Sequence, residues 1–185
     1  MGKTKQLLPL SGRPLIAHCL DTVLTAGIRD IIVVLGHNGE EIAKVLSGMP
    51  VHIIFNELQN SEMADSARKG LSAVAPSSTG IIIYPSDYPL VKPETIMTLA
   101  REHNGFPDRI VIPVHGGKRG HPTLFPREAI NELVQGATLR DIINRDAGRN
   151  RFVSVTDSGV LLDVDTKEDY LGIVRATNSA GGSLS

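Results

Sequence analysis

Two aspartates in short turns are the residues of this sequence best suited to chemistry. Asp87 lies between prolines in Pro85-Ser-Asp-Tyr-Pro89, directly after the apolar run 81–84, and Asp165 follows the run 160–162. Ligands of open parallel sheets bind beyond the carboxyl ends of the strands. Two carboxylates at neighbouring strand ends could therefore share one hard cation such as Mg²⁺.

Each aspartate also has a purely structural interpretation. Asp87 could form an Asx turn ahead of Pro89. Asp165 could cap a helix together with Glu168, or Thr166 could do so with Asp169 one step later. Residue type alone favours these structural roles, and only the matching positions at two strand ends favour the functional one, so both interpretations stay open.

Two cationic segments could bind an anion. Lys5 lies in a polar opening stretch, where the alternative is a frayed, solvated terminus. The loop 115–122, His-Gly-Gly-Lys-Arg-Gly-His-Pro, combines glycine freedom with cationic donors and could close over phosphates. Its alternative is a flexible hairpin connection.

Two familiar site types are disfavoured. Gly2-Lys3-Thr4 matches the end of a P-loop, but a P-loop leads straight into a helix and Pro9 stands where that helix would begin. The 6 histidines show no spacing typical of a zinc site.

Composition narrows the class of protein. The chain has 185 residues, a formal net charge of −1 and 1 cysteine, which argues against a nucleic-acid or membrane surface and excludes an internal disulfide. Aromatic residues make up 4%, so the core must be aliphatic. No apolar run approaches the ~20 residues of a membrane span. We expect a soluble, cytoplasmic protein with no nucleic-acid and no membrane partner.

The alternation of hydrophobic patterns predicts a three-layer α/β fold with a mostly parallel mixed sheet. Nearly continuous branched runs predict strands over 31–35, 51–55, 81–84 and 110–112, and shorter ones over 123–125, 152–155 and 160–162, with one antiparallel member. Helical periodicity predicts helices over 15–24, 40–46, 64–74, 93–103, 127–134, 138–145 and 167–175. We expect one domain over 1–177 and a disordered tail over 178–185.

Five segments, taken in chain order, resemble the MobA-like nucleotidyltransferases, most closely the molybdenum cofactor cytidylyltransferase branch. They are Met1-Gly-x-x-Lys5-Gln-Leu-Leu-Pro-Leu-x-Gly12-x-Pro14; Asn56 with Met63-Ala-x-Ser66-x-Arg68-x-Gly70-Leu71; Ser86-Asp87-Tyr88-Pro89; Gly120-His121-Pro122-Thr-Leu-Phe125; and Asp163-Val-Asp165-Thr-x-Glu-Asp169-Tyr170. Each is weak alone, and their order makes the resemblance specific for the superfamily.

The resemblance implies a Rossmann-like nucleotide-diphospho-sugar transferase fold and a reaction. An NMP, CMP from CTP in this branch, would pass to a phosphorylated acceptor such as molybdopterin with release of pyrophosphate. Mg²⁺ would be the cofactor, and a molybdoenzyme chaperone would be a further partner.

The resemblance also implies roles for particular residues. Lys5, Asp87 and Asp165 would be catalytic, with Asp87 and Asp165 binding Mg²⁺. Base and ribose would lie against Asn38, Asn56 and Ser66, and the acceptor against Lys118, Gly120 and His121.

The sequence departs from the family pattern in three places. The family's first strand and glycine-rich loop precede Met-Gly, so we expect a sheet that lacks its first strand, in a chain that is truncated or internal to a longer one. Glu62 and Asp65 stand where the family often has Gly and Ser, and residues 136–141 differ as well.

The alternatives to a cytidylyltransferase are a related enzyme using GTP or a sugar or other phosphate acceptor, and a truncated, inactive binding domain.

Overall fold

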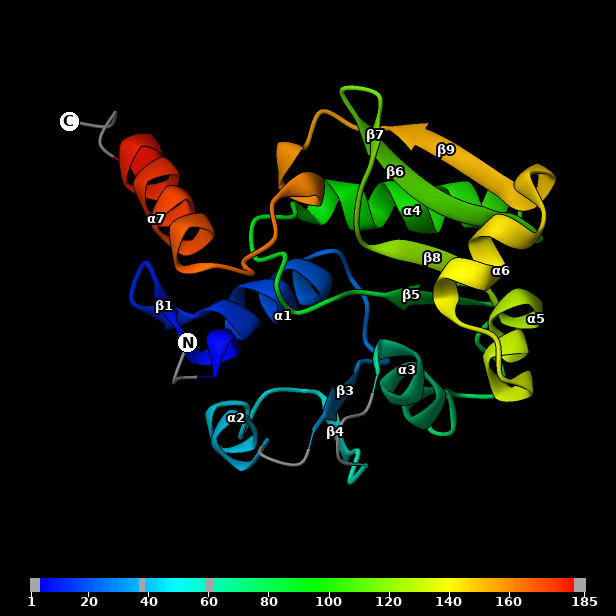
Figure 1. Ribbon diagram of the computed structural model, residues 1–185, viewed down its shortest axis with the longest axis horizontal. Coiled ribbons are helices and arrows are strands. Elements are labelled where there is room, and N and C mark those ends of the chain that lie inside the picture. The colour runs from blue at the N-terminus through cyan, green and yellow to red at the C-terminus, as the bar shows by residue number, and fades with distance from the viewer. Residues whose placement is uncertain (1–3, 37–38, 59–61, 182–185) are drawn as a thin grey trace.

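A computed structural model of the chain describes residues 4–36, 39–58 and 62–181 (Figure 1). Its helices are α1 (Leu15–Thr25), α2 (Glu40–Val45), α3 (Met63–Leu71), α4 (Pro93–Gly105), α5 (Arg127–Ile130), α6 (Leu139–Arg145) and α7 (Lys167–Gly181). Its strands are β1 (Pro9–Leu10), β2 (Arg13–Pro14), β3 (Ile32–Leu35), β4 (His52–Phe55), β5 (Gly80–Ile83), β6 (Ile110–His115), β7 (Lys118–Arg119), β8 (Thr123–Pro126) and β9 (Asn150–Ser154).

The larger sheet is mixed, as the sequence predicted. Its strands are hydrogen-bonded in the order β5-β8-β6-β7, and β9 also pairs with β6, outside this order. β8 runs antiparallel to both β5 and β6, whereas β9 runs parallel to β6. Strands β5, β6 and β9 therefore point the same way, and the predicted antiparallel member is β8.

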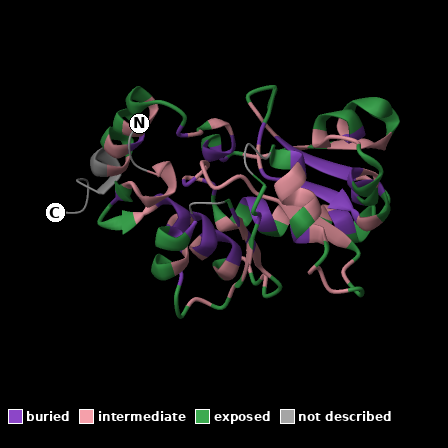
Figure 2. Ribbon diagram, turned by 60° about the horizontal axis from the view of Figure 1, so that its bottom comes forward, coloured by how far each residue is buried: buried purple, intermediate pink, exposed green. Residues whose placement is uncertain are grey.

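Helices cover both faces of this sheet. In β6, Ile112 packs with Ile130 and Leu133 on the side of α5, while Val111 packs with Leu99 of α4 on the opposite side. Successive side chains of a strand point to opposite faces, so a strand covered on both sides must be apolar throughout. Figure 2 shows the resulting buried band along these strands, and the predicted α/β class is confirmed.

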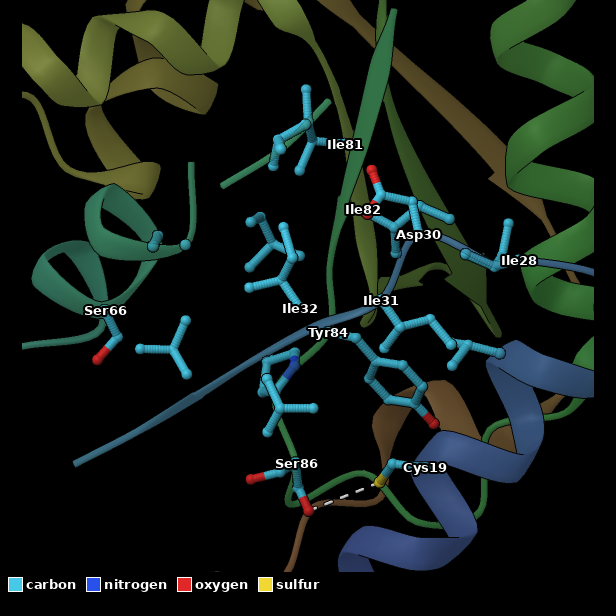
Figure 3. A pocket seen from close by; sticks show the side chains of 18 of the residues that line it. Cys19, Ile28, Asp30, Ile31, Ile32, Ser66, Ile81, Ile82, Tyr84 and Ser86 are labelled. Atoms are coloured by element: carbon cyan, nitrogen blue, oxygen red, sulfur yellow. Dashed lines mark hydrogen bonds between the residues drawn. The ribbon is translucent and has the colours of Figure 1, made fainter. Parts of the chain in front are cut away.

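Strands β3 and β4 form a separate parallel pair. Leu20 and Val23 of α1 belong to the same buried apolar cluster as Val33 and Leu35 of β3. No strand among residues 4–36, 39–58 and 62–181 joins β3 to β5. An open apolar cavity of about 990 Å³ separates them, lined by both strands and by α1 and α3 (Figure 3). This break matches the expected sheet with one strand missing.

The predicted strand over 160–162 is wrong, because this segment is a 3₁₀ helix, Ser158–Leu161. The buried carboxylate of Asp157 accepts hydrogen bonds from the Gly159 and Lys92 amides and fixes a tight turn. A Cβ on Gly159 would lie 2.2 Å from the Leu90 carbonyl oxygen, so the chain passes there without room for a side chain.

Helix α7 runs to Gly181 and so includes residues 178–181, where the sequence predicted the start of a disordered tail. Residues 182–185 lie outside the described part. Among the helices that the structure describes, none combines the length and the apolar character needed to cross a membrane.

Candidate active site

The N-terminal segment is anchored by the last helix. Lys5 begins a 3₁₀ turn, Lys5–Leu7, which leads into the β1–β2 hairpin. Leu10 of that hairpin is buried in a cluster with Val164 and Ile173, and the Tyr170 hydroxyl donates to the Pro9 carbonyl at 2.5 Å. The segment that carries Lys5 is therefore packed against α7, which argues against a frayed terminus.

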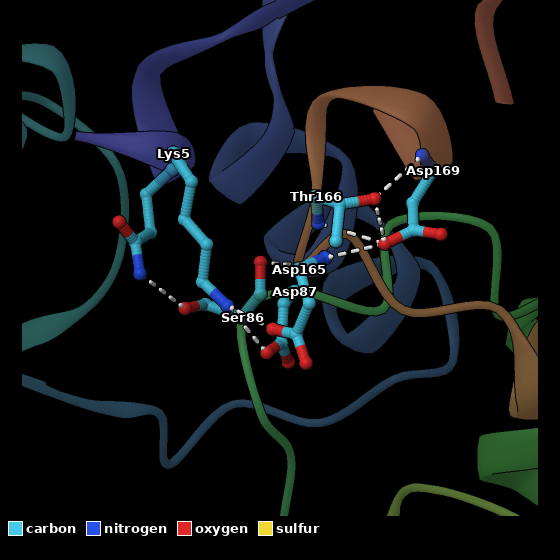
Figure 4. A network of polar contacts seen from close by, with 8 residues as sticks. Lys5, Ser86, Asp87, Asp165, Thr166 and Asp169 are labelled. Carbon is cyan, nitrogen blue, oxygen red and sulfur yellow. Dashed lines mark hydrogen bonds and ion pairs between the residues drawn. The ribbon is translucent and has the colours of Figure 1, made fainter. Parts of the chain in front are cut away.

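Lys5 joins the two aspartates that the sequence singled out (Figure 4). Its Nζ lies 2.8 Å from Asp87 Oδ2 and 2.8 Å from Asp165 Oδ1. The two carboxylates therefore lie within reach of a single cation, as the interpretation of a shared cation site requires.

The backbone holds the two aspartate turns together. The Val164 amide donates to the Asp87 carbonyl at 2.9 Å, which ties the segment before α7 to the turn after β5. The Asp87 side chain is 20% exposed and that of Asp165 is 62% exposed. The pair thus has an inner and an outer carboxylate, and a ligand can approach from the Asp165 side.

The helix-capping role falls to Thr166 and Asp169, the second of the structural alternatives. Asp169 Oδ2 accepts from the Thr166 amide and hydroxyl, both at 2.7 Å, and the Asp169 amide donates to Thr166 Oγ1. The hydrogen bonds that the Asp169 carboxylate accepts from Thr166, led by the one from the hydroxyl, lower the pKa of Asp169. The carboxylate of Asp165 is left to face Lys5.

Burial and the nearby carboxylates shift the pKa values of Lys5 and Tyr88. Partial burial lowers the pKa of Lys5, but hydrogen bonds and charges from Asp165 and Asp87 outweigh it, so the net shift is upward. Burial, followed by the charges of Asp163 and Asp87, raises the pKa of Tyr88 to about 12. Lys5 is therefore charged and Tyr88 neutral at neutral pH.

The residues present fit a divalent hard cation. Asp87 Oδ1 is buried and has no hydrogen-bond partner, while its other oxygen and Asp165 Oδ1 already hold a positive charge, that of Lys5. No group of 3 or more His, Cys, Asp or Glu side chains able to hold a metal occurs in the described part of the chain. A pair of carboxylates suits Mg²⁺, which binds through one or two carboxylates plus substrate phosphates.

Two of the three residues expected to contact the nucleoside lie together. Asn56, at the end of β4, is 3% exposed, and its Nδ2 donates to Ser66 Oγ of α3 at 3.4 Å. Ser66 lines the same cavity as Ser86, the neighbour of Asp87 (Figure 3). Asn38 lies outside the described residues.

Of the residues expected on the acceptor side, Gly120 and His121 pack against the segment that contains Val160, whereas Lys118 is exposed. The His121 amide donates to the Val160 carbonyl at 2.9 Å, and its ring lies 4.9 Å from that of Tyr88, beside the Asp87 turn. A Cβ on Gly120 would lie 2.5 Å from the Val160 carbonyl oxygen, so this position needs glycine for close packing. Lys118 is exposed on β7.

Gln6 belongs to the site but was not among the predicted residues. Its Nε2 donates to Ser86 Oγ at 3.5 Å, next to Asp87. The feature of the sequence that could have indicated Gln6 is its position beside Lys5 in the opening motif.

Asp65, which departs from the family pattern, has a structural role. Its Oδ2 accepts from the Glu62 amide at 2.8 Å at the start of α3, and its other oxygen pairs with Arg68. The amide hydrogen bond, followed by that of Arg68, lowers the pKa of Asp65. Its charge is therefore largely compensated within α3.

Comparison with known proteins assigns the class. The profile described as "MobA-like NTP transferase domain" matches residues 1–154, and the chain belongs to this family. Membership supports a transferase of nucleotidyl groups.

Individual relatives are consistent with this class. Over 181 residues the chain is 32% identical to the bifunctional protein GlmU of Paraburkholderia phymatum, covering 96% of this chain and 38% of that one. The chain thus spans less than two-fifths of that curated relative.

Solved structures show the same fold. A nucleotidyl transferase from Methanothermobacter matches with a TM-score of 0.83 and 25% identity, covering 95% of this chain and 86% of that one. Rv0371c from Mycobacterium tuberculosis, solved in complex with manganese, matches with a TM-score of 0.80 and 28% identity, covering 94% and 93% of the two chains.

Proposed function

We propose that this chain transfers a nucleoside monophosphate from an NTP to a phosphorylated small-molecule acceptor and releases pyrophosphate. The observation that carries the proposal is the pair of carboxylates, Asp87 and Asp165, held around one positive charge beside the cavity. Family membership and the manganese complex of a structural relative support the same reading.

The chemistry demands positioning and charge neutralisation more than a protein nucleophile. An acceptor phosphate is ionised at neutral pH and can attack the α-phosphorus directly. A divalent cation, Mg²⁺ in our proposal, would be held by Asp87 and Asp165 and would neutralise the charge of the triphosphate. Lys5 would bind a phosphate oxygen as a point charge.

The remaining polar residues would orient the two substrates. Asn56 and Ser66 would contact the base or ribose on the side of β4 and α3. His121 lies at the Asp87 turn and would face the acceptor, with Gly120 and Lys118 in the same hairpin. Burial lowers the pKa of His121 against the opposing charges of Asp87 and Asp163, so its ring would meet the acceptor as a neutral imidazole.

For the substrates, we propose CTP as the donor and molybdopterin as the acceptor, with a molybdoenzyme chaperone as protein partner. The resemblance of the five motifs to the cytidylyltransferase branch motivates this choice. GTP, or a sugar phosphate acceptor, is the rival within the same class.

Pyrophosphate release measured across the four NTPs and several phosphorylated acceptors tests the proposal. The expected result is release that requires both a divalent cation and one preferred NTP–acceptor pair. No release with any pair would contradict the transfer of a nucleotidyl group, whether or not an NTP raises the melting temperature.

One observation favours a second candidate, a domain that binds nucleotide without turning it over. The break between β3 and β5 leaves the cavity beside the carboxylate pair open. This candidate predicts an NTP-dependent rise in melting temperature without pyrophosphate release.

A further inference from the structure

The three charged groups of the site present a conflict when a metal ion must also bind. Asp87 Oδ2 and Asp165 Oδ1, one oxygen from each carboxylate that would hold a divalent cation, are both 2.8 Å from the ammonium of Lys5. Like charges a few ångströms apart in a partly buried site repel strongly. An ion placed between these oxygens would therefore compete with Lys5 for the same position.

We propose that the ammonium of Lys5 occupies the position of the divalent cation in the nucleotide-free chain, so that the metal binds tightly only when nucleotide phosphates draw Lys5 away. This inference rests on the proposed function, because it assumes that the carboxylate pair receives the metal and that Lys5 contacts phosphate.

The structure gives Lys5 the freedom to make this exchange. Its backbone is fixed, since the Leu8 amide donates to the Lys5 carbonyl at 3.1 Å and the Leu7 amide to the Thr4 carbonyl at 2.9 Å. Its side chain is 29% exposed and has four rotatable methylene groups. The ammonium can thus move from the carboxylates to a nearby phosphate while the 3₁₀ turn stays in place.

Displacement of Lys5 from the carboxylates is favourable only when the metal and the nucleotide bind together. Metal alone would leave Lys5 without its carboxylates, and nucleotide alone would leave two carboxylates facing a triphosphate. When both bind, the carboxylates hold the metal and the lysine holds phosphate, so every charge is paired. Because coupling between two ligands is reciprocal, metal and nucleotide should each tighten the binding of the other.

Direct binding of Mn²⁺, followed by electron paramagnetic resonance without nucleotide, tests the inference on the wild type, Lys5→Gln and Lys5→Arg. We expect Lys5→Gln to bind Mn²⁺ at least tenfold more tightly than the wild type, since it removes the competing charge. Lys5→Arg keeps that charge and should stay as weak as the wild type. Equal affinity of the wild type and Lys5→Gln, or tight binding by Lys5→Arg, would overturn the proposal.

A double variant locates the metal. Adding Asp87→Asn to Lys5→Gln should abolish the gain in Mn²⁺ affinity, and a gain that persists would overturn the proposal, because the ion would then bind elsewhere. The coupling is measured separately as the Kd for CTP with and without saturating Mn²⁺. Mn²⁺ should tighten CTP binding to the wild type at least tenfold more than to Lys5→Gln, and equal tightening would overturn the proposal.

The readouts separate this inference from the proposed function. If Lys5→Gln gains Mn²⁺ affinity through Asp87 but the wild type releases no pyrophosphate, the proposed function fails while the cation exchange stands. If turnover is observed but Mn²⁺ affinity does not respond to Lys5, the exchange fails and the function stands.

Discussion

A partly buried carboxylate is stabilised by a nearby cation, and Asp87 obtains one from Lys5. This single contact links the opening segment of the chain to the turn after β5. The same lysine reaches Asp165, so three residues distant in sequence form one charge cluster. Capping by Thr166 and Asp169 makes this possible, because it leaves Asp165 available.

His121 should make the stability of the protein depend on pH. Its usual pKa is 6.5, and burial lowers it in the folded chain against the opposing charges of Asp87 and Asp163. As the pH falls below about 6.5, the unfolded chain therefore takes up a proton before the folded chain does, and stability decreases until the lower folded pKa is passed.

The variant His121→Gln removes this group, so its melting temperature should fall less steeply than that of the wild type between about pH 7 and about pH 5. Thermal melts at matched ionic strength measure the two slopes. Buried His103, whose pKa burial also lowers, remains in the variant and accounts for a residual slope. Identical slopes would show that His121 is not held neutral.

At the scale of elements, the short turn over Ser158–Leu161 brings Asp165 to Asp87. Asp157 anchors this turn to the start of α4 through the Lys92 amide and the Thr95 hydroxyl, at 2.8 and 2.7 Å. Gly159 lets the turn pass against the backbone of Leu90. A strand in this place would have directed Asp163 and Asp165 along the sheet instead of toward Asp87. The turn is therefore needed to form the site.

Gly159→Ala should destabilise the protein by about 1–3 kcal/mol, because the added Cβ would overlap the Leu90 carbonyl and force the backbone to shift. Urea denaturation measures the change in the free energy of unfolding. Gly172→Ala in α7 is the matched control, since nothing lies within 4 Å of its added Cβ. This control should be neutral or stabilising by up to about 1 kcal/mol. Equal stabilities of the two variants would contradict the role of the turn.

The elements that could be predicted from the sequence are those with local signals. The runs 31–35, 51–55 and 110–112 are long and branched enough to predict buried strands, and β3, β4 and β6 are found there. The run 160–162 has the same apolar character, but the contacts of Asp157 and Gly159 with the segment before α4 impose a turn. Such long-range contacts leave no periodic signal in the sequence.

In the candidate site, too, the features with local signals could be predicted from the sequence and those that depend on long-range contacts could not. The types and positions of Asp87 and Asp165 predicted that they could share a cation, and the structure brings them together. The ordered position of Lys5 was harder to predict, because it depends on the contact of Pro9 with Tyr170, 161 residues along the chain. The pairing of Gln6 with Ser86 depends on the same anchoring.

At the scale of the whole molecule, the β3–β4 pair is attached to the rest of the protein less firmly than the strands of the larger sheet are attached to one another. It shares no strand pairing with β5 within the described ranges, and the cavity lies between them. By contrast, β6 lies between β8 and β9, and its Ile110 and Val111 are 0% exposed. Regions with fewer buried contacts open at a lower free energy than the core.

Amide hydrogen exchange should therefore be at least tenfold faster in β3 and β4 than in β6. Exchange followed by mass spectrometry or nuclear magnetic resonance gives both rates in one experiment. Strand β9 serves as an internal control, because it pairs with β6 and should share much of its protection. Uniform protection of all these strands would show that the molecule opens as one unit.

The central claim is that Asp87 and Asp165 act together on one cation during nucleotidyl transfer. The most direct measurement is the rate of pyrophosphate release, with Mg²⁺ and the preferred NTP and acceptor, for the wild type, Asp87→Ala and Asp165→Ala. Exposed Glu168→Gln, which removes one negative charge from the same stretch as Asp165, is the matched control. We predict that each aspartate variant loses at least about a hundredfold in rate while the control keeps the wild-type rate. A near-normal rate in either aspartate variant would contradict the claim.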